Sequence, residues 1–226
     1  MKLLLWDIDG TLICSGRAGE RALVRAMKKI HGIDTDLAWV DFRGRTDALI
    51  ARNLYAHHKL DPHPQSLHDF LEAYLAFLPE EMRTPSGKTL PGILDILEKV
   101  RLRPDLRQGL LTGNLSRGAQ IKLEHYQVWH YFEFGAFADD SPIRNELGPH
   151  ALRRAREKFN REFPPENVFI IGDTPHDIAC GKIIGAKTIA VATGGFSLED
   201  LRAHHPTALL ADFQDVDAFF GVIDGN

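Results

Sequence analysis

The stretch KLLLWDIDGTL, residues 2–12, decides the fold. Its apolar run Leu3–Trp6 fits a strand that is buried on both faces of a sheet. The run ends at Asp7 and Asp9, which lie two residues apart, so an extended backbone directs both carboxylates to one side. Gly10 permits a sharp turn there. Two carboxylates this close repel each other, and a divalent cation would relieve the repulsion. The stretch therefore favours catalysis at a strand end over a solvated Asx-turn.

The segment DIDGT, Asp7–Thr11, resembles the signature loop of the haloacid dehalogenase-like (HAD) phosphatases. The resemblance implies that Asp7 attacks phosphorus and becomes an aspartyl-phosphate. It implies that Asp9 protonates the leaving oxygen and then activates water. This division of one difficult step into two is the general logic of covalent catalysis. The rest of the chain must then supply a donor to the phosphate oxygens, a fixed cation and a metal-binding pair of acids.

The composition is that of an ordinary globular protein. Of the 226 residues, 44% are hydrophobic and 26% are charged, and the net charge is −4. This charge predicts no general affinity for nucleic acid or for anionic membranes. The apolar runs are too short for a membrane span, and no secretory signal is expected because Asp7 and Asp9 interrupt the apolar N-terminal stretch. Two cysteines, Cys14 and Cys180, are too few for a disulfide framework, which makes a reducing cytoplasm the expected location.

Apolar periodicity divides the chain into a helical block and an alternating part. Within residues 16–83 the pattern predicts helices at 20–31, 48–58 and 67–77, and residues 79–87 read as a linker. The alternating part has predicted strands at 3–6, 108–111, 134–137, 168–171, 188–191 and 208–210, with helices between them. This alternation predicts an α/β fold with a Rossmann-like parallel sheet. The predicted domains are an α/β core at 1–15 and 84–226 and an inserted all-helical domain at 16–83, which the resemblance identifies as a cap.

Polar groups collect where the predicted strands end. Open parallel sheets bind ligands beyond the carboxyl ends of their strands, so these groups are expected to face one crevice. They are Asp7, Asp9, Thr112, Gly113, Asn114, Asp139, Asp140, Asp173 and Asp177.

Thr112, Gly113 and Asn114 offer a hydroxyl group and backbone amides that suit a phosphoryl oxygen. Their position resembles the second motif of the family, a Thr or Ser at the end of the next core strand. The resemblance implies that these three residues bind substrate. Asn114 also suits the N-cap of the helix predicted from Leu115, and both roles can hold together.

The segment GDTPHD, residues 172–177, resembles the acidic fourth motif of the family. Carboxylate oxygens are hard ligands, and a set of them that includes no Cys or His ligand suits Mg²⁺. The resemblance makes Asp173 a direct metal ligand beside the Asp7 carboxylate and the Asp9 backbone carbonyl. Asp177 is expected to act from outside this set or through water. The alternative is a helix N-terminus at which the helix dipole favours acids, and this explains Asp177 better than Asp173.

The third family motif is a Lys or Arg after the third core strand, often followed by Pro. The corresponding segment here, residues 141–147, contains no Lys-Pro pair. Arg144 is the nearest cation and is assigned this role, with Arg153 and Arg154 of the following helix as alternatives. A surface Arg144 paired with Glu146 is the competing interpretation.

The segment GRTD, residues 44–47, resembles the substrate-facing part of the cap in phosphoglycolate-phosphatase-like members. Arg45 is assigned to read a carboxylate or a second phosphate of the substrate. An Arg in a solvated turn is the alternative. A cap of this kind would exclude water from the site.

These motifs predict a Mg²⁺-dependent phosphatase of a small phosphorylated metabolite. A sugar phosphomutase of the same fold is the first alternative. A non-catalytic binding protein on this fold and a receiver-type signalling domain are weaker ones. A dehalogenase is disfavoured because those relatives lack the second Asp, which is Asp9 here. Neither the substrate nor the oligomeric state can be read from the sequence.

Overall fold

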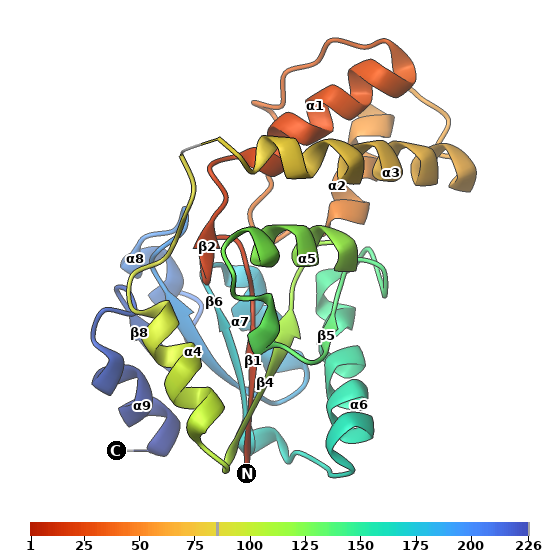
Figure 1. Ribbon diagram of the computed structural model, residues 1–226. Helices are drawn as coiled ribbons and strands as arrows, with labels where there is room; N and C mark the ends of the chain where they lie inside the picture. Colours follow the sequence, from red (N-terminus) through yellow and green to blue (C-terminus); the bar gives the residue numbers. More distant parts are fainter. Residues whose placement is uncertain (85, 226) are drawn as a thin grey trace.

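A six-stranded parallel sheet forms the centre of the fold (Figure 1). The computed structural model describes residues 1–84 and 86–225. Across the sheet the strands are β5 (Gly135–Ala136), β4 (Leu106–Leu111), β1 (Lys2–Trp6), β6 (Val168–Gly172), β7 (Lys187–Val191) and β8 (Ala208–Leu210). Leu5 of β1 is in register with Gly109 of β4 and Ile170 of β6. The predicted α/β fold is confirmed, and Asp7 follows a strand with neighbours on both sides.

Helices cover both faces of the sheet. The side chains of β1 alternate: Leu4 and Trp6 join the cluster that includes residues of α4 (Ile93–Leu102), α5 (Ser116–His125) and α9 (Val216–Asp224), whereas Leu3 and Leu5 contact the cluster that contains α6 (Leu147–Phe159). The helix α7 (Pro175–Ile183) contributes to this second side through Cys180. Each of these side chains of β1 is fully buried, which stabilises the fold by roughly 1.5–3 kcal/mol per large apolar side chain.

Three helices form an insertion between β1 and β4: α1 (Ala18–His31), α2 (Asp47–His57) and α3 (Pro64–Glu81). They pack around their own apolar cluster, which includes Tyr55 and Phe70. Figure 1 shows them beyond the carboxyl ends of the sheet strands. The chain enters the insertion through β2 (Ile13–Cys14) and returns through β3 (Lys88–Thr89), and these two strands pair antiparallel. The insertion therefore begins and ends at one place beside the sheet.

Several boundaries differ from the predicted ones. The helix α3 continues through Pro79, so the predicted linker at 79–87 is wrong in its first part. Pro79 lies inside α3, where it has no N–H to donate to the carbonyl of Leu75, and the helix continues to Glu81. The pair β2 and β3, the short helix α8 (Leu198–Arg202) and three 3₁₀ turns were not predicted. These turns are η1 (Trp129–Tyr131), η2 (Arg144–Glu146) and η3 (Pro165–Asn167). Pro85 of the predicted linker and Asn226 lie outside the described residues.

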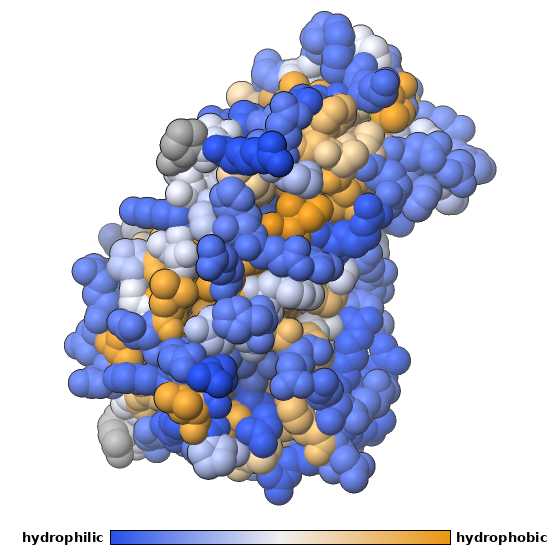
Figure 2. Space-filling model, in the orientation of Figure 1, coloured by the Kyte–Doolittle hydropathy of each residue, from blue (hydrophilic) through white to orange (hydrophobic). Residues whose placement is uncertain are grey.

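The face of the molecule drawn in Figure 2 is mostly hydrophilic, with apolar side chains in separate patches. Within residues 1–84 and 86–225, no helix combines the length and the apolar character that a membrane crossing requires. The predicted cytoplasmic location stays a prediction.

Candidate active site

A cavity of about 420 Å³ lies where the carboxyl ends of the strands meet the helical insertion. Both parts of the chain line it. Most of the strand-end groups predicted to face one crevice do so, but Asp139, Asp140 and Asp177 do not line the cavity. The core contributes Asp7, Asp9, Thr112, Gly113, Asn114, Lys122, Arg144 and Asp173, and the insertion contributes Leu23, Phe42, Arg45, Asp47, Ile50 and Tyr74.

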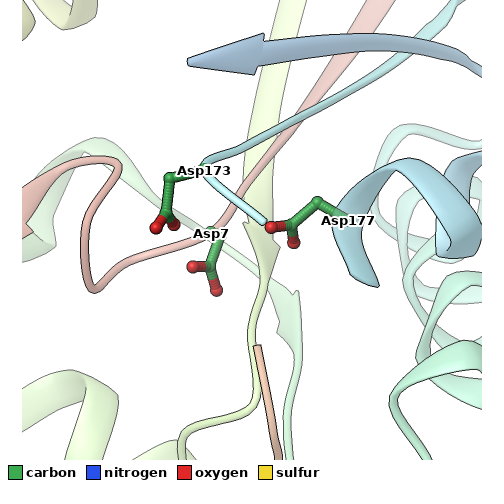
Figure 3. A group of neighbouring side chains, drawn as sticks. All are labelled: Asp7, Asp173 and Asp177. Atoms are coloured by element: carbon green, nitrogen blue, oxygen red, sulfur yellow. The ribbon is translucent and has the colours of Figure 1, made fainter. Parts of the chain in front are cut away.

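Three buried carboxylates gather at the carboxyl ends of β1 and β6. Asp7 follows β1, Asp173 follows β6, and Asp177 lies in the first turn of α7. Each offers an oxygen within 4.8 Å of the others, and their residues are only 5%, 3% and 1% exposed. Figure 3 shows the three side chains converging from these separate segments. The structure thus brings together the first and fourth motifs, which are far apart in the sequence.

Glycines make room for this cluster. Gly10 has φ +84°, and a Cβ at this position would lie 2.4 Å from Asp173 Oδ2. A Cβ at Gly194 would lie 1.7 Å from the same oxygen. Any side chain at either position would displace the Asp173 carboxylate, so these glycines allow it to approach the Asp7 loop.

Arg144 is the cation of the cluster. Its Nη2 donates to Asp7 Oδ1 at 2.9 Å and also bonds Asp177 Oδ1, and its side chain is only 6% exposed. The alternatives to Arg144 do not reach this place: Arg153 is exposed, and Arg154 pairs with Asp140 at 2.6 Å. The competing interpretation, a surface Arg144 paired with Glu146, is wrong, because Arg144 is buried and Glu146 accepts from Ser141 Oγ at 2.6 Å.

The cluster carries more negative than positive charge. Burial raises the pKa of Asp7 to about 6, against the opposing effect of Arg144. Burial also raises the pKa of Asp173 well above its usual value, and the neighbouring Asp7 and Asp177 add to the rise. When all three carboxylates are ionised, the single guanidinium leaves a net negative charge that a divalent cation would balance. The ligand atoms of this cluster are carboxylate oxygens, the hard ligands that Mg²⁺ prefers. The residues present therefore fit a magnesium ion.

Asp177 belongs to the acidic cluster and also caps the N-terminus of α7. Its Oδ2 accepts from the backbone N–H of Thr174 at 3.0 Å and from Thr174 Oγ1 at 2.7 Å, which forms a capping box. The helix-terminus interpretation is thus confirmed for Asp177. With Oδ1 bonded to Arg144, both of its oxygens are engaged, whereas Asp173 accepts one side-chain bond, from Thr11 Oγ1 at 3.2 Å.

Asp9 lines the same cavity as Asp7, but its carboxylate is held by different partners. Oδ1 accepts from Ser15 Oγ at 2.7 Å, and Oδ2 accepts from Asn114 Nδ2 at 3.0 Å and from Lys122 Nζ at 2.6 Å. Burial opposes the charge on Asp9, but these three donors outweigh it and lower the pKa of the carboxyl. Asp7 and Asp9 therefore have pKa values shifted in opposite directions, upward for Asp7 and downward for Asp9.

Lys122 was missed by the sequence reasoning. It lies on α5, its side chain is 6% exposed, and Nζ donates to Asp9 Oδ2 and to Asn114 Oδ1, both at 2.6 Å. A lysine within an amphipathic helix ordinarily reads as solvated. No local signal in the sequence marks this lysine, because its burial comes from the insertion, whose Leu75 and Leu78 lie within 4 Å of a Cβ built on Gly118, one turn earlier on the same face.

The second motif, Thr112 to Asn114, lines the cavity, and several of its polar groups already have hydrogen-bond partners. Thr112 Oγ1 accepts from Asn114 Nδ2 at 2.9 Å. The backbone N–H of Thr112 donates to Ala136 O at 3.1 Å, so this amide does not bind a phosphoryl oxygen, contrary to the prediction. The prediction of Asn114 as N-cap is wrong, because its side chain turns toward Asp9. Carboxylates from distant segments cap α5 instead: Asp47 accepts from Leu115 N at 2.8 Å, and Asp139 accepts from Ser116 N at 2.6 Å.

The loop before α2 rests on the core beside these groups. Asp47 N donates to Gly113 O at 2.7 Å, and Thr46 Oγ1 donates to Pro142 O at 2.6 Å. A Cβ on Gly113 would lie 2.1 Å from Arg45 O, so the contact requires glycine. The Arg45 side chain lines the cavity, is 38% exposed, and lies 3.5 Å from Asp41.

Comparison with known proteins gives matches over nearly the whole chain. Phosphoglycolate phosphatase of Vibrio vulnificus (strain CMCP6) is 25% identical over 213 residues, which cover 91% of this chain and 90% of the relative. N-acetylmuramic acid 6-phosphate phosphatase of Pseudomonas aeruginosa is 27% identical over 219 residues, with coverage of 94% and 91%. Among solved structures, CbbY from Rhodobacter sphaeroides in complex with phosphate has the same fold, with a TM-score of 0.76, 20% identity and 96% of each chain covered.

Residues 4–182 match the family described as haloacid dehalogenase-like hydrolase. This span contains the Asp7–Thr11 loop, Arg144 and both acids of the fourth motif. Together with the phosphatase relatives, the match supports a phosphoric monoester hydrolase, which confirms the predicted class of enzyme. The chain belongs to the haloacid dehalogenase-like hydrolase family.

Proposed function

We propose that this protein is a Mg²⁺-dependent phosphatase that hydrolyses a small phosphomonoester through an aspartyl-phosphate on Asp7. The observation that carries the proposal is the buried group of Asp7, Asp173 and Asp177 with the cation Arg144, at one end of a cavity large enough for a metabolite.

The residues that would hold Mg²⁺ are Asp7 and Asp173 through their carboxylates and Asp9 through its backbone carbonyl. Asp177 supports the site from outside, because its oxygens already bond Thr174 and Arg144. When bound, the ion would neutralise charge on the phosphate oxygens and on the acids around them. Its two positive charges would balance the net negative charge that the three carboxylates have beside Arg144.

Asp7 is the nucleophile of the first step. Its carboxylate oxygen attacks phosphorus as the bond to the alcohol oxygen breaks, and Asp9 donates a proton to that oxygen. Arg144 holds one oxygen of Asp7 at 2.9 Å, which orients the carboxylate and stabilises its ionised form. Thr112, Gly113 and Asn114 line the same cavity as Asp7 and would receive a phosphoryl oxygen there.

Asp9 acts as the base of the second step. It takes a proton from water as the water oxygen attacks the phosphorus of the aspartyl-phosphate, which releases phosphate and regenerates Asp7. The lowered pKa of Asp9 keeps it ionised for this step. In the first step, the negative charge of a bound phosphate favours its protonated form.

The insertion at residues 16–83 serves as the cap of this site. Its loop before α2 bonds the core at Gly113 and Pro142 and so lies over the strand ends. Arg45 would read an anionic group on the part of the substrate distant from the phosphate. The two named phosphatase relatives act on phosphorylated small molecules, and we propose a substrate of the same kind.

The proposal is tested by release of phosphate from p-nitrophenyl phosphate with Mg²⁺, after addition of EDTA, and after Mg²⁺ is restored in excess. Turnover that EDTA stops and Mg²⁺ restores is expected, and Asp7→Asn protein should show none. Full activity in metal-free buffer would contradict the proposal. A sugar phosphomutase, the alternative, would isomerise sugar phosphates without a matching release of phosphate, so a parallel assay of sugar phosphates separates the two.

A further inference from the structure

A lysine ammonium group is enclosed between the core and the insertion. The Lys122 side chain is 6% exposed, and it bonds Asp9 and Asn114 at 2.6 Å each. A Cβ on Gly19 of α1 would lie 3.8 Å from Lys122 Nζ, so the insertion approaches this group closely. Burying an ammonium group costs free energy unless its partners compensate for the lost hydration. An apolar side chain of similar size at such a position often leaves the protein equally stable or more stable. Stability alone is therefore a weak reason for a lysine here.

The partners of Lys122 are the residues next to the reacting groups. The ammonium holds Asp9 directly through Oδ2 and indirectly through Asn114, whose Nδ2 donates to the same oxygen at 3.0 Å. Asn114 is fixed in turn by Thr112 Oγ1 at 2.9 Å. Ser15 holds the other oxygen of Asp9. The Asp9 carboxylate thus has one charged partner and two neutral ones, which together define its orientation in the cavity.

An acid of the insertion lies close to the same ammonium. The buried carboxylate of Asp47 on α2 accepts from Leu115 N, at the start of the helix that carries Lys122. Burial raises the pKa of Asp47 to about 6, and the positive charge of Lys122 opposes the rise. The positive charge of Lys122 therefore acts on an acid of the core, Asp9, and on an acid of the insertion, Asp47.

We infer that Lys122 is a positioning residue that holds the Asp9 carboxylate where it exchanges protons with the ester oxygen and with water. This inference rests on the proposed function. It goes further, because none of the motifs recognised in the sequence includes Lys122.

The chemistry predicts a dependence on the leaving group. An alkoxide must be protonated as it departs, whereas p-nitrophenolate leaves with little help. Misplacement of a catalytic group by about 1 Å costs up to about 100-fold in rate, and general acid–base assistance is worth about 10²–10⁴-fold. Loss of Lys122 should therefore slow alkyl phosphates by about 30–100-fold and p-nitrophenyl phosphate by less than about 3-fold in the phosphorylation step.

The experiment compares Lys122→Met and Lys122→Gln with wild type and with Lys99→Met, a control at a lysine that is 54% exposed on α4. Single-turnover rates of phosphorylation are measured for p-nitrophenyl phosphate and for an alkyl phosphate, and KM is measured for both. We expect a selective loss on the alkyl phosphate in Lys122→Met, partial recovery in Lys122→Gln, whose amide can still donate to Asp9, and no change in the control.

Equal losses on both leaving groups, or no loss on either, would overturn the inference while the proposed function stands. Wild-type protein without Mg²⁺-dependent turnover would overturn both. Circular dichroism and thermal unfolding establish that each variant is folded. If neither Lys122 variant folds, a crystal structure of the wild type with Mg²⁺ and phosphate decides: Nζ within hydrogen-bond distance of Asp9 supports the inference, and a separated pair overturns it.

Discussion

Replacing Asp7 with Asn should stabilise the metal-free protein at neutral pH, even though it abolishes turnover. The pKa of Asp7 rises from 3.8 to about 6 in the folded state, chiefly because the side chain is buried. The unfolded chain therefore releases this proton at lower pH than the folded chain does. Between about pH 4 and pH 6 the folded state binds more protons, so the contribution of Asp7 to stability falls as pH rises through this window.

The magnitude follows from the size of the rise. Each pH unit between the two pKa values corresponds to about 1.4 kcal/mol, so ionised Asp7 costs the metal-free fold about 3 kcal/mol at pH 7. The Asp7→Asn substitution would remove this cost but would also weaken the bond from Arg144, because a neutral amide oxygen would replace the carboxylate as acceptor, while Arg144 retains Asp177 as a partner. This weakening of a charge-assisted hydrogen bond offsets about 1–2 kcal/mol. The expected net gain at pH 7 is about 1–2 kcal/mol.

The assay is urea unfolding of wild type and Asp7→Asn in EDTA, at a series of pH values from 4 to 7.5, with the free energy of unfolding extrapolated to water. Asp217→Asn serves as the control, since the Asp217 side chain is 96% exposed. The difference between Asp7→Asn and wild type should grow with pH and level off above pH 7, whereas the control should stay flat. A difference that is constant with pH, or that favours wild type increasingly at neutral pH, would refute the reasoning.

Further predictions concern three other side chains. Asp173→Asn should raise the Mg²⁺ concentration for half-maximal activity at least about tenfold, and an unchanged titration would remove Asp173 from the metal site. Arg144→Met should lower the free energy of unfolding by about 3–5 kcal/mol at pH 7 in EDTA, because it leaves Asp7 and Asp177 buried without a cation, and a loss under about 1 kcal/mol would contradict this. Arg45→Ala should raise KM for a substrate with a second anionic group more than for p-nitrophenyl phosphate. Equal effects on both substrates would place Arg45 outside the specificity pocket.

Local signals in the sequence were enough to predict the core and much of the site. The apolar run Leu3–Trp6 followed by two acids predicted β1 and the position of Asp7, because a buried parallel strand needs a continuous apolar stretch. Arg144 was assigned from its order along the chain, and the structure brings it to Asp7. Asp173 and Asp177 were identified from the resemblance of residues 172–177 to the fourth motif of the family, and this segment lies at the end of an apolar strand.

What the sequence did not reveal depends on contacts between distant segments. Asn114 suits an N-cap by its residue type, but the nearby carboxylates of Asp47 and Asp139 cap α5, which frees Asn114 for Asp9. Lys122 is buried only because the insertion covers that face of α5, and no local pattern encodes such cover. The strands β2 and β3 are two residues each, too short for periodicity to detect.

Covalent phosphate on Asp7 is the decisive observation for the proposed mechanism. Asp9→Asn protein is mixed with p-nitrophenyl phosphate and Mg²⁺, quenched in acid within one turnover, digested and sequenced by mass spectrometry. The leaving group departs largely without a proton, while nothing activates water afterwards, so the phosphoryl group should accumulate on the peptide that contains Asp7. The double variant Asp7→Asn with Asp9→Asn should carry none. Release of p-nitrophenolate without protein-bound phosphate, or phosphate bound at another residue, would contradict an aspartyl-phosphate on Asp7.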